Sequence, residues 1–139
     1  MKDSSDFPHK GQCLCGSIQY EVAEIDSRIG HCHCSMCRKF HGAAFATFAS
    51  ANADDFRWVA GKEVLKTYRA ENATLRKFCA NCGSSLIFEA EGDERGLVIF
   101  ALGTLDTAID LRPVAHLFTD HGASWYEITD DLLQFKENA

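Results

Sequence analysis

Short segments in which apolar and polar residues alternate recur along the chain and predict a protein made mainly of β-strands. The alternation is clear at residues 18–22, where Gln19 and Glu21 separate three apolar side chains. Residues 97–102 are continuously apolar, which is typical of a strand buried on both faces. Further strands are expected at residues 56–58, 75–78, 86–90 and 115–118.

Helical patterns are scarce. One short helical turn is expected at Ser35–His41, with Ser35 as its N-cap and Gly42 as the residue that ends it. A second short turn is expected at Thr129–Phe135. The sequence therefore predicts a mainly β protein with one or two short helical turns.

The chain of 139 residues is long enough for one domain with a modest core. Residues 1–10 are polar and lack a strand pattern, so we expect a flexible N-terminal tail there. The folded domain is expected to cover residues 11–135.

Charge and hydropathy exclude several classes of partner. The formal net charge is −6, and an acidic surface repels phosphate backbones, so nucleic acid is not an expected partner. Residues 1–10 lack the apolar core of a signal peptide, and no apolar stretch reaches the length of a membrane span. We therefore expect a cytoplasmic protein without membrane contact. The sequence carries no signal for an oligomeric state.

Seven cysteines in three tight clusters are the main chemical signal. In a reducing compartment, dense cysteines indicate metal binding or catalysis more often than disulfides. Four thiolates close a structural zinc site, whereas three leave one coordination position for water or substrate, as in catalytic zinc sites. The clusters are Cys13-x-Cys15, Cys32-x-Cys34-x-x-Cys37 and Cys79-x-x-Cys82.

The first and third clusters differ in how clearly they indicate metal. Cys79-x-x-Cys82 is followed by Gly83, which suits the sharp turn of a zinc knuckle. Cys13 and Cys15 would point to opposite faces of a regular strand, so they share an ion only in a bent segment.

The central cluster could place three sulfurs around one ion near a helix N-terminus. Arg38 and Lys39 follow it directly and are candidates to bind an anionic substrate, although both suit a solvated helix face equally well. His31 and His33 alternate with the thiols and are expected to face away from the metal as hydrogen-bonding neighbours of the ligands.

Spacing alone leaves the pairing of the clusters open. Cys34 and Cys37 could instead join Cys79 and Cys82 in a zinc ribbon, with the other three cysteines left over.

The cysteine segments resemble a known family, that of the glutathione-dependent formaldehyde-activating enzymes, which includes centromere protein V. The resemblance covers about residues 11–135 and includes all seven cysteines. It is carried by Gly11-Gln12-Cys13-Leu14-Cys15-Gly16, His31-Cys32-His33-Cys34-Ser35-Met36-Cys37-Arg38-Lys39 and Phe78-Cys79-Ala80-Asn81-Cys82-Gly83.

This resemblance implies a fold and two zinc ions. The family fold is a single domain of coiled antiparallel β-sheets around zinc, similar to that of a Rab-associated zinc protein. By the resemblance, the first and third clusters share a structural zinc, with Cys13, Cys15, Cys79 and Cys82 as ligands. Cys32, Cys34 and Cys37 would then hold a second zinc at an open, catalytic site.

The resemblance also implies a reaction: the addition of glutathione to formaldehyde, which gives S-(hydroxymethyl)glutathione and is classed with the carbon–sulfur lyases. The expected partner is a small-molecule thiol or thiol adduct. The chain departs from its relatives at residues 120–126, which lack the lysine and proline common there. Trp125 remains a candidate to pack near the site. The alternative function is a non-enzymatic zinc module that buffers metal or binds a protein, with a histidine such as His31 or His33, or a group from the partner, closing the second site.

Overall fold

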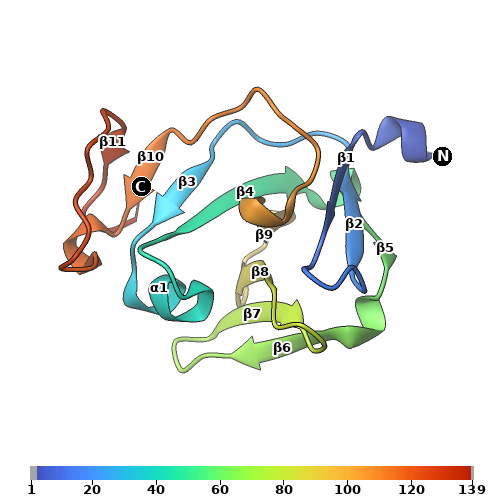
Figure 1. The fold of residues 1–139 in the computed structure, drawn as a ribbon, viewed down its shortest axis with the longest axis horizontal. Helices are drawn as coiled ribbons and strands as arrows, with labels where there is room; N and C mark the ends of the chain where they lie inside the picture. The colour runs from blue at the N-terminus through green and yellow to red at the C-terminus, as the bar shows by residue number, and fades with distance from the viewer. Residues whose placement is uncertain (1–2, 139) are drawn as a thin grey trace.

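Two β-sheets form the framework of the protein, which is described here from a computed structural model covering residues 3–138 (Figure 1). This part of the chain holds eleven strands, five short 3-10 turns and one α-helix, α1 (Ser35–His41). The strands are β1 (His9–Gln12), β2 (Gln19–Val22), β3 (Gly30–Cys32), β4 (Ala46–Asn52), β5 (Phe56–Ala60), β6 (Leu65–Arg69), β7 (Thr74–Cys79), β8 (Ser85–Ala90), β9 (Leu97–Ala101), β10 (Ala115–Leu117) and β11 (Leu133–Gln134). The 3-10 turns are η1 (Ser4–Asp6), η2 (Ala53–Asp55), η3 (Lys62–Val64), η4 (Leu102–Thr104) and η5 (Thr119–His121).

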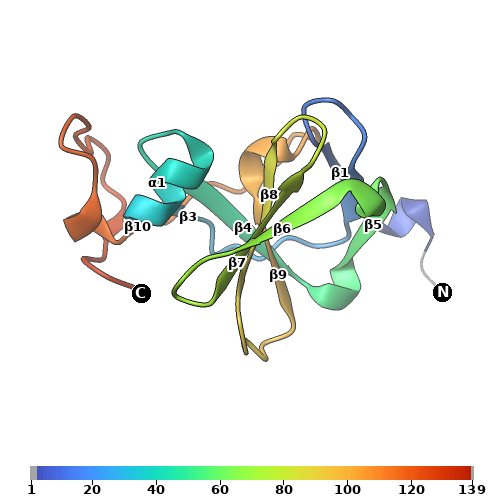
Figure 2. The same cartoon turned by 90° about the horizontal axis from the view of Figure 1, so that it is seen from below.

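The smaller sheet has the strand order β1-β2-β5, and the larger has the order β11-β10-β3-β4-β9-β8-β7-β6. Neighbouring strands are antiparallel except around β10, which runs parallel to both β3 and β11. Figure 2 shows the strong twist of the larger sheet from β4 to β6. The prediction of a mainly β, single-domain protein is confirmed.

The core forms where the two sheets face each other. Tyr20 of β2 stacks on Phe56 of β5 with ring centroids 5.0 Å apart, and Phe100 of β9 lies 5.6 Å from Tyr20. Strand β9 lies between β4 and β8, and Phe100 is fully buried, so the continuously apolar segment is a central strand as predicted. The same core includes Cys13 and Cys79, which places two of the thiols at its edge.

The two expected helical turns had different outcomes. Helix α1 covers Ser35–His41 and ends at Gly42, which has a positive φ of 61°, as the sequence indicated. The expectation of helix at Thr129–Phe135 was wrong, because that segment contains β11. There the Phe135 N–H donates to the His116 carbonyl, so pairing with the sheet satisfies the backbone in place of a helix.

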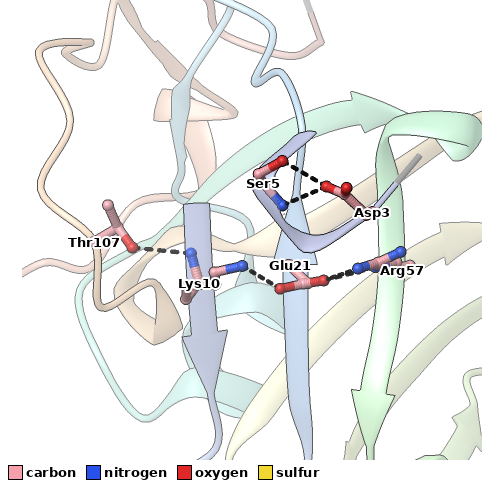
Figure 3. Close-up of polar contacts among 6 residues, drawn as sticks. All are labelled: Asp3, Ser5, Lys10, Glu21, Arg57 and Thr107. Carbon is pink, nitrogen blue, oxygen red and sulfur yellow. Dashed lines mark hydrogen bonds and ion pairs between the residues drawn. The ribbon is translucent and has the colours of Figure 1, made fainter. Parts of the chain in front are cut away.

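A buried carboxylate ties β1 to the rest of the smaller sheet. Glu21 of β2 is ion-paired with Lys10 of β1 on one side and Arg57 of β5 on the other (Figure 3). The Lys10 N–H also donates to Thr107 Oγ1 at 2.9 Å. The domain boundary at residue 11 stays a prediction; in the structure, β1 begins two residues before it.

Figure 3 also shows the short N-terminal segment, where Asp3 accepts hydrogen bonds from the N–H and hydroxyl of Ser5. Phe7 is buried, and the guanidinium of Arg57 lies 4.3 Å from its ring centre. No helix within residues 3–138 has the length and apolar character needed to cross a membrane.

Candidate functional site

Four thiols from two hairpin turns meet between the sheets and form what we call the four-thiol cluster. The Sγ atoms of Cys13, Cys15, Cys79 and Cys82 all lie within 4.8 Å of one another. The Cys13–Cys15 and Cys15–Cys79 sulfur distances are 3.6 and 3.8 Å, too long for disulfide bonds. A tetrahedral zinc with Zn–S bonds of about 2.3 Å places its sulfurs about 3.8 Å apart. The donor set therefore fits a closed zinc site.

Each turn of this cluster bends sharply at a glycine. Gly16 and Gly83 both have a φ of 80°, a conformation that glycine adopts readily. Their N–H groups donate to the carbonyls of Cys13 and Cys79, at 3.0 and 2.8 Å. The bend lets Cys13 and Cys15 point to one place, which a regular strand would prevent.

Serine hydroxyls also contact the thiols, although no sequence pattern singled them out. Ser84 Oγ lies 3.3 Å from Cys82 Sγ, and this contact lowers the pKa of Cys82 to about 5. Ser17 lies 3.2 Å from Cys15 Sγ and lowers its pKa in the same way. Both hydroxyls favour the thiolate, the form that binds metal.

The remaining cysteines form the three-thiol cluster, again with all Sγ atoms within 4.8 Å. Cys32 ends β3, and Cys37 lies in the first turn of α1. Cys34 is the N-cap of α1, and its sulfur accepts the Cys37 N–H at 3.3 Å. The prediction that Ser35 caps the helix was therefore wrong, because the preceding thiol takes that role.

Contacts among the three thiols shift the pKa values of Cys34 and Cys32 in opposite directions. Hydrogen bonds with Cys32 and Cys37 hold the pKa of Cys34 far below its usual value, and the nearby Arg76 guanidinium acts in the same direction. The same contact with Cys34, followed by that with Cys37, raises the pKa of Cys32. These contacts favour the thiolate form of Cys34, the form that binds metal.

Arg76 is a neighbour of this cluster that sequence reasoning missed. It lies on β7, is only 3% exposed, and donates from Nη1 to Cys37 Sγ at 3.5 Å. Its guanidinium carbon lies 5.0 Å from the ring centre of Phe88 and 5.7 Å from that of Phe40. A charged residue in a strand pattern is normally interpreted as solvent-facing, so the sequence held no signal for its burial.

The structure shows which cysteine motifs lie together and which lie apart. Cys34 and Cys37 group with Cys32, and the third cluster groups with the first. The zinc-ribbon arrangement is therefore absent from the described residues. Both groups have the number of thiols that the resemblance implied.

His31 and His33 lie outside the three-thiol group, but their hydrogen bonds go to residues other than the thiol ligands expected from the sequence. His33 Nε2 lies 2.7 Å from Nδ1 of His116, whose Nε2 in turn lies 3.0 Å from Asp130. His31 Nδ1 lies 2.8 Å from Thr47 Oγ1. Within residues 3–138, no imidazole nitrogen joins the three sulfurs.

The candidate substrate-binding residues and Trp125 lie in different surroundings. Lys39 lines a cavity beside α1, whereas Arg38 is half-buried and its Nε has no hydrogen-bond partner within residues 3–138. Trp125 is 71% exposed, so the idea that it packs near the site was wrong. Its neighbour Tyr126 lies 6.2 Å from His33, between ring centres, and lines a second cavity with it.

Comparisons with known proteins place this chain in a family. The model of the family described as "Glutathione-dependent formaldehyde-activating enzyme" matches residues 8–121. A protein of Halomonas elongata, provisionally named as such an enzyme, is 31% identical over 86% of this chain and 80% of its own. An uncharacterised lyase of Schizosaccharomyces pombe is 29% identical over 58% of this chain, and the match spans 56% of that protein's length.

A solved structure shares the fold. The crystal structure of a Rhodobacter sphaeroides protein matches with a TM-score of 0.60 and 28% identity, covering 73% of this chain and 91% of that one. The family match extends over most of the chain and includes both thiol clusters. The chain therefore belongs to the family of glutathione-dependent formaldehyde-activating enzymes.

Proposed function

We propose that this protein is a zinc-dependent carbon–sulfur lyase-type enzyme that adds glutathione, or a related thiol, to formaldehyde. The product with glutathione would be S-(hydroxymethyl)glutathione. The observation that carries the proposal is the three-thiol cluster, which has one ligand fewer than its neighbour and no imidazole to complete it within residues 3–138. A lyase-type reaction also agrees with the family and with the names of the two relatives.

The two clusters would hold two zinc ions with different tasks. Cys13, Cys15, Cys79 and Cys82 would hold a structural ion, because four thiolates complete a tetrahedral shell. Cys32, Cys34 and Cys37 would hold the reactive ion and leave one position for the substrate sulfur. Zinc there would supply a positive charge that favours the thiolate form of a bound thiol.

The reaction itself needs few groups from the protein. The thiol sulfur forms a bond to the carbonyl carbon of formaldehyde, the π electrons move to oxygen, and the thiol proton ends on that oxygen. Holding the thiol near the aldehyde lowers the entropic cost of the encounter. Arg38 and Lys39 are proposed to bind a carboxylate of the thiol substrate.

The test is the exchange rate between formaldehyde, glutathione and their adduct, measured by NMR exchange spectroscopy. The wild-type protein should raise this rate above the uncatalysed value, and Cys34→Ser should not. Ser35→Ala is the matched control, because Ser35 is the next residue, is exposed and contributes no ligand. A fully active Cys34→Ser protein would refute the assignment.

The same experiment distinguishes catalysis from metal removal and from a non-enzymatic role. Glutathione could remove the second zinc instead of reacting beside it, and mass spectrometry of the reaction mixture would then show one ion fewer per chain. The non-enzymatic alternative predicts no rate increase and a closed second site. Within residues 3–138 no imidazole lies with the three sulfurs, so a closed second site would need a group supplied by a partner.

A further inference from the structure

A cavity of about 530 Å³ lies beside the three-thiol cluster and is lined by residues of α1 and of the β6–β7 hairpin. We call it the α1 cavity. Asn72 of the hairpin donates to Met36 of α1 at 3.4 Å, which links its two walls. Its main lining residues are Met36, Lys39 and Phe40 from the helix and Tyr68, Asn72 and Arg76 from the hairpin.

Arg76 joins this cavity to the thiols. One end of its guanidinium contacts Cys37 Sγ, and the residue also lines the cavity wall. Met36, another lining residue, lies between Cys34 and Cys37 in the chain. A molecule in the cavity is thus next to the cluster that we propose as the reactive site.

The bonding of Arg76 is incomplete. Its Nε is buried and has no hydrogen-bond partner within residues 3–138, where no carboxylate forms a salt bridge with it either. Burying a guanidinium is costly unless anions accept its N–H groups. The Cys37 sulfur supplies one such acceptor, at the long distance of 3.5 Å. The guanidinium therefore has capacity for a second anion.

We propose that the α1 cavity binds a carboxylate of the thiol substrate, held by Arg76 and Lys39, while the substrate sulfur lies at the three-thiol cluster. This inference rests on the proposed function for its substrate class. Arginine suits the task because its planar fork can bond a sulfur and a carboxylate through different nitrogens. The flanking rings of Phe40 and Phe88 hold the guanidinium in place.

A carboxylate of the protein also lines the cavity, so the lining holds charges of both signs. Glu71 lines the cavity and is exposed. Its charge opposes a bound carboxylate, whereas the exposed Lys39 favours one. Neutralising these two residues should therefore change the affinity for an anionic thiol in opposite directions.

The experiment compares two thiols by NMR chemical-shift titration of the metal-loaded protein. Glutathione carries carboxylates, whereas 2-mercaptoethanol carries a thiol and no carboxylate. Lys39→Gln should weaken glutathione binding by up to about fivefold, and Glu71→Gln should strengthen it by a similar factor. Arg76→Gln should weaken it by about tenfold or more, with partial rescue by Arg76→Lys. Binding of 2-mercaptoethanol should stay within about twofold for the two surface variants, given the weak effect of exposed charges.

Lys136→Gln is the matched control, because Lys136 is exposed and lines the other cavity. It should leave glutathione affinity unchanged. The proposal is overturned if Lys39→Gln and Glu71→Gln leave glutathione affinity unchanged, or shift both thiols equally. Both residues are exposed, so this result does not depend on whether the Arg76 variants fold.

S-methylglutathione separates this inference from the proposed function. It keeps both carboxylates but has no free thiol, so it cannot react. Lys39-dependent binding of this compound would support the carboxylate site even if the protein does not catalyse the formaldehyde reaction. Catalysis without any discrimination between glutathione and 2-mercaptoethanol would support the function and refute the site.

Discussion

The four-thiol and three-thiol clusters use the same ligand atom but are built in different ways. The first joins two hairpin turns that are 64 residues apart in the chain, counted between Cys15 and Cys79. The second comes from one continuous segment, residues 32–37, that runs from β3 into α1. A metal that closes a long loop restricts the unfolded chain strongly, whereas a metal held by neighbouring residues restricts it little. Metal at the first cluster should therefore stabilise the fold, and metal at the second should mainly serve chemistry.

The groups that surround the two clusters also differ. The four-thiol cluster is contacted by neutral groups, namely the Ile18 N–H and the hydroxyls of Ser17 and Ser84. The three-thiol cluster has a buried cation, Arg76, and an adjoining cavity. Neutral groups are enough around a closed site, whereas a positive charge and open space suit the binding of an anionic substrate. With these proposed roles, one type of side chain would serve stability at one cluster and reactivity at the other.

The largest effect is expected from breaking the four-thiol cluster. Cys82→Ser should remove one metal ion and unfold the domain, since structural zinc contributes on the order of 10 kcal/mol to folding in small domains. Thermal denaturation followed by circular dichroism tests this. An unchanged melting temperature would show that the cluster does not hold the fold together.

Breaking the three-thiol cluster should remove activity but leave the fold intact. Cys34→Ser should abolish the formaldehyde reaction and remove the other metal ion, but leave a cooperatively folded protein. Its melting temperature should fall by only a few degrees, because a loss of about 1 kcal/mol has that effect in a chain of this size. If Cys34→Ser unfolds the domain as Cys82→Ser does, the two clusters do not differ in role.

A glycine beside the first thiol turn offers an indirect test. Gly61 has a φ of 80°, and a Cβ built on it would lie 1.9 Å from the Ser17 carbonyl oxygen. Gly61→Ala should destabilise the protein by about 2–4 kcal/mol, from strain and overpacking together. Gly92→Ala is matched in backbone angle, with a φ of 82° and nothing within 4 Å, and should cost only about 1 kcal/mol. Equal losses in chemical denaturation would show that the close approach at Ser17 is unimportant.

The smallest effect concerns pH and the core beside the four-thiol cluster. Burial raises the pKa of Tyr20 from its usual 10.0 to about 12. The Tyr20 hydroxyl lies 2.7 Å from Thr104 Oγ1. The folded state then holds this proton more tightly than the unfolded state. Its contribution to stability is complete below pH 10 and is lost as the pH rises towards 12. Tyr20→Phe should flatten the fall in unfolding free energy across this window; an unaltered slope would contradict the assignment.

Local signals in the sequence were enough for parts of the fold. Helix α1 was predictable because its polar start and Gly42 are local features, and β9 because its apolar run is continuous. Strand β4 was not predicted, since it is built largely of alanine, serine and threonine, whose buried side chains leave a weak hydrophobic pattern. The resemblance, rather than the spacing, paired the clusters in advance.

The surroundings of the thiols could not be predicted, because they depend on contacts between distant residues. Arg76 reaches Cys37 across 39 positions, and His33 reaches His116 across 83. Neither partner stands out from its neighbours in the sequence. Arg76 lies on β7 and His116 on β10, and both are buried by contacts between distant segments that only the fold reveals.

The most direct test of two unlike zinc sites is native mass spectrometry of the purified protein during titration with glutathione. We predict two zinc ions per chain, with glutathione adding to or displacing only one. Cys34→Ser should retain the ion that glutathione does not affect. Two ions that are both inert to glutathione, or a single ion in the wild-type protein, would contradict the assignment of one structural and one reactive site.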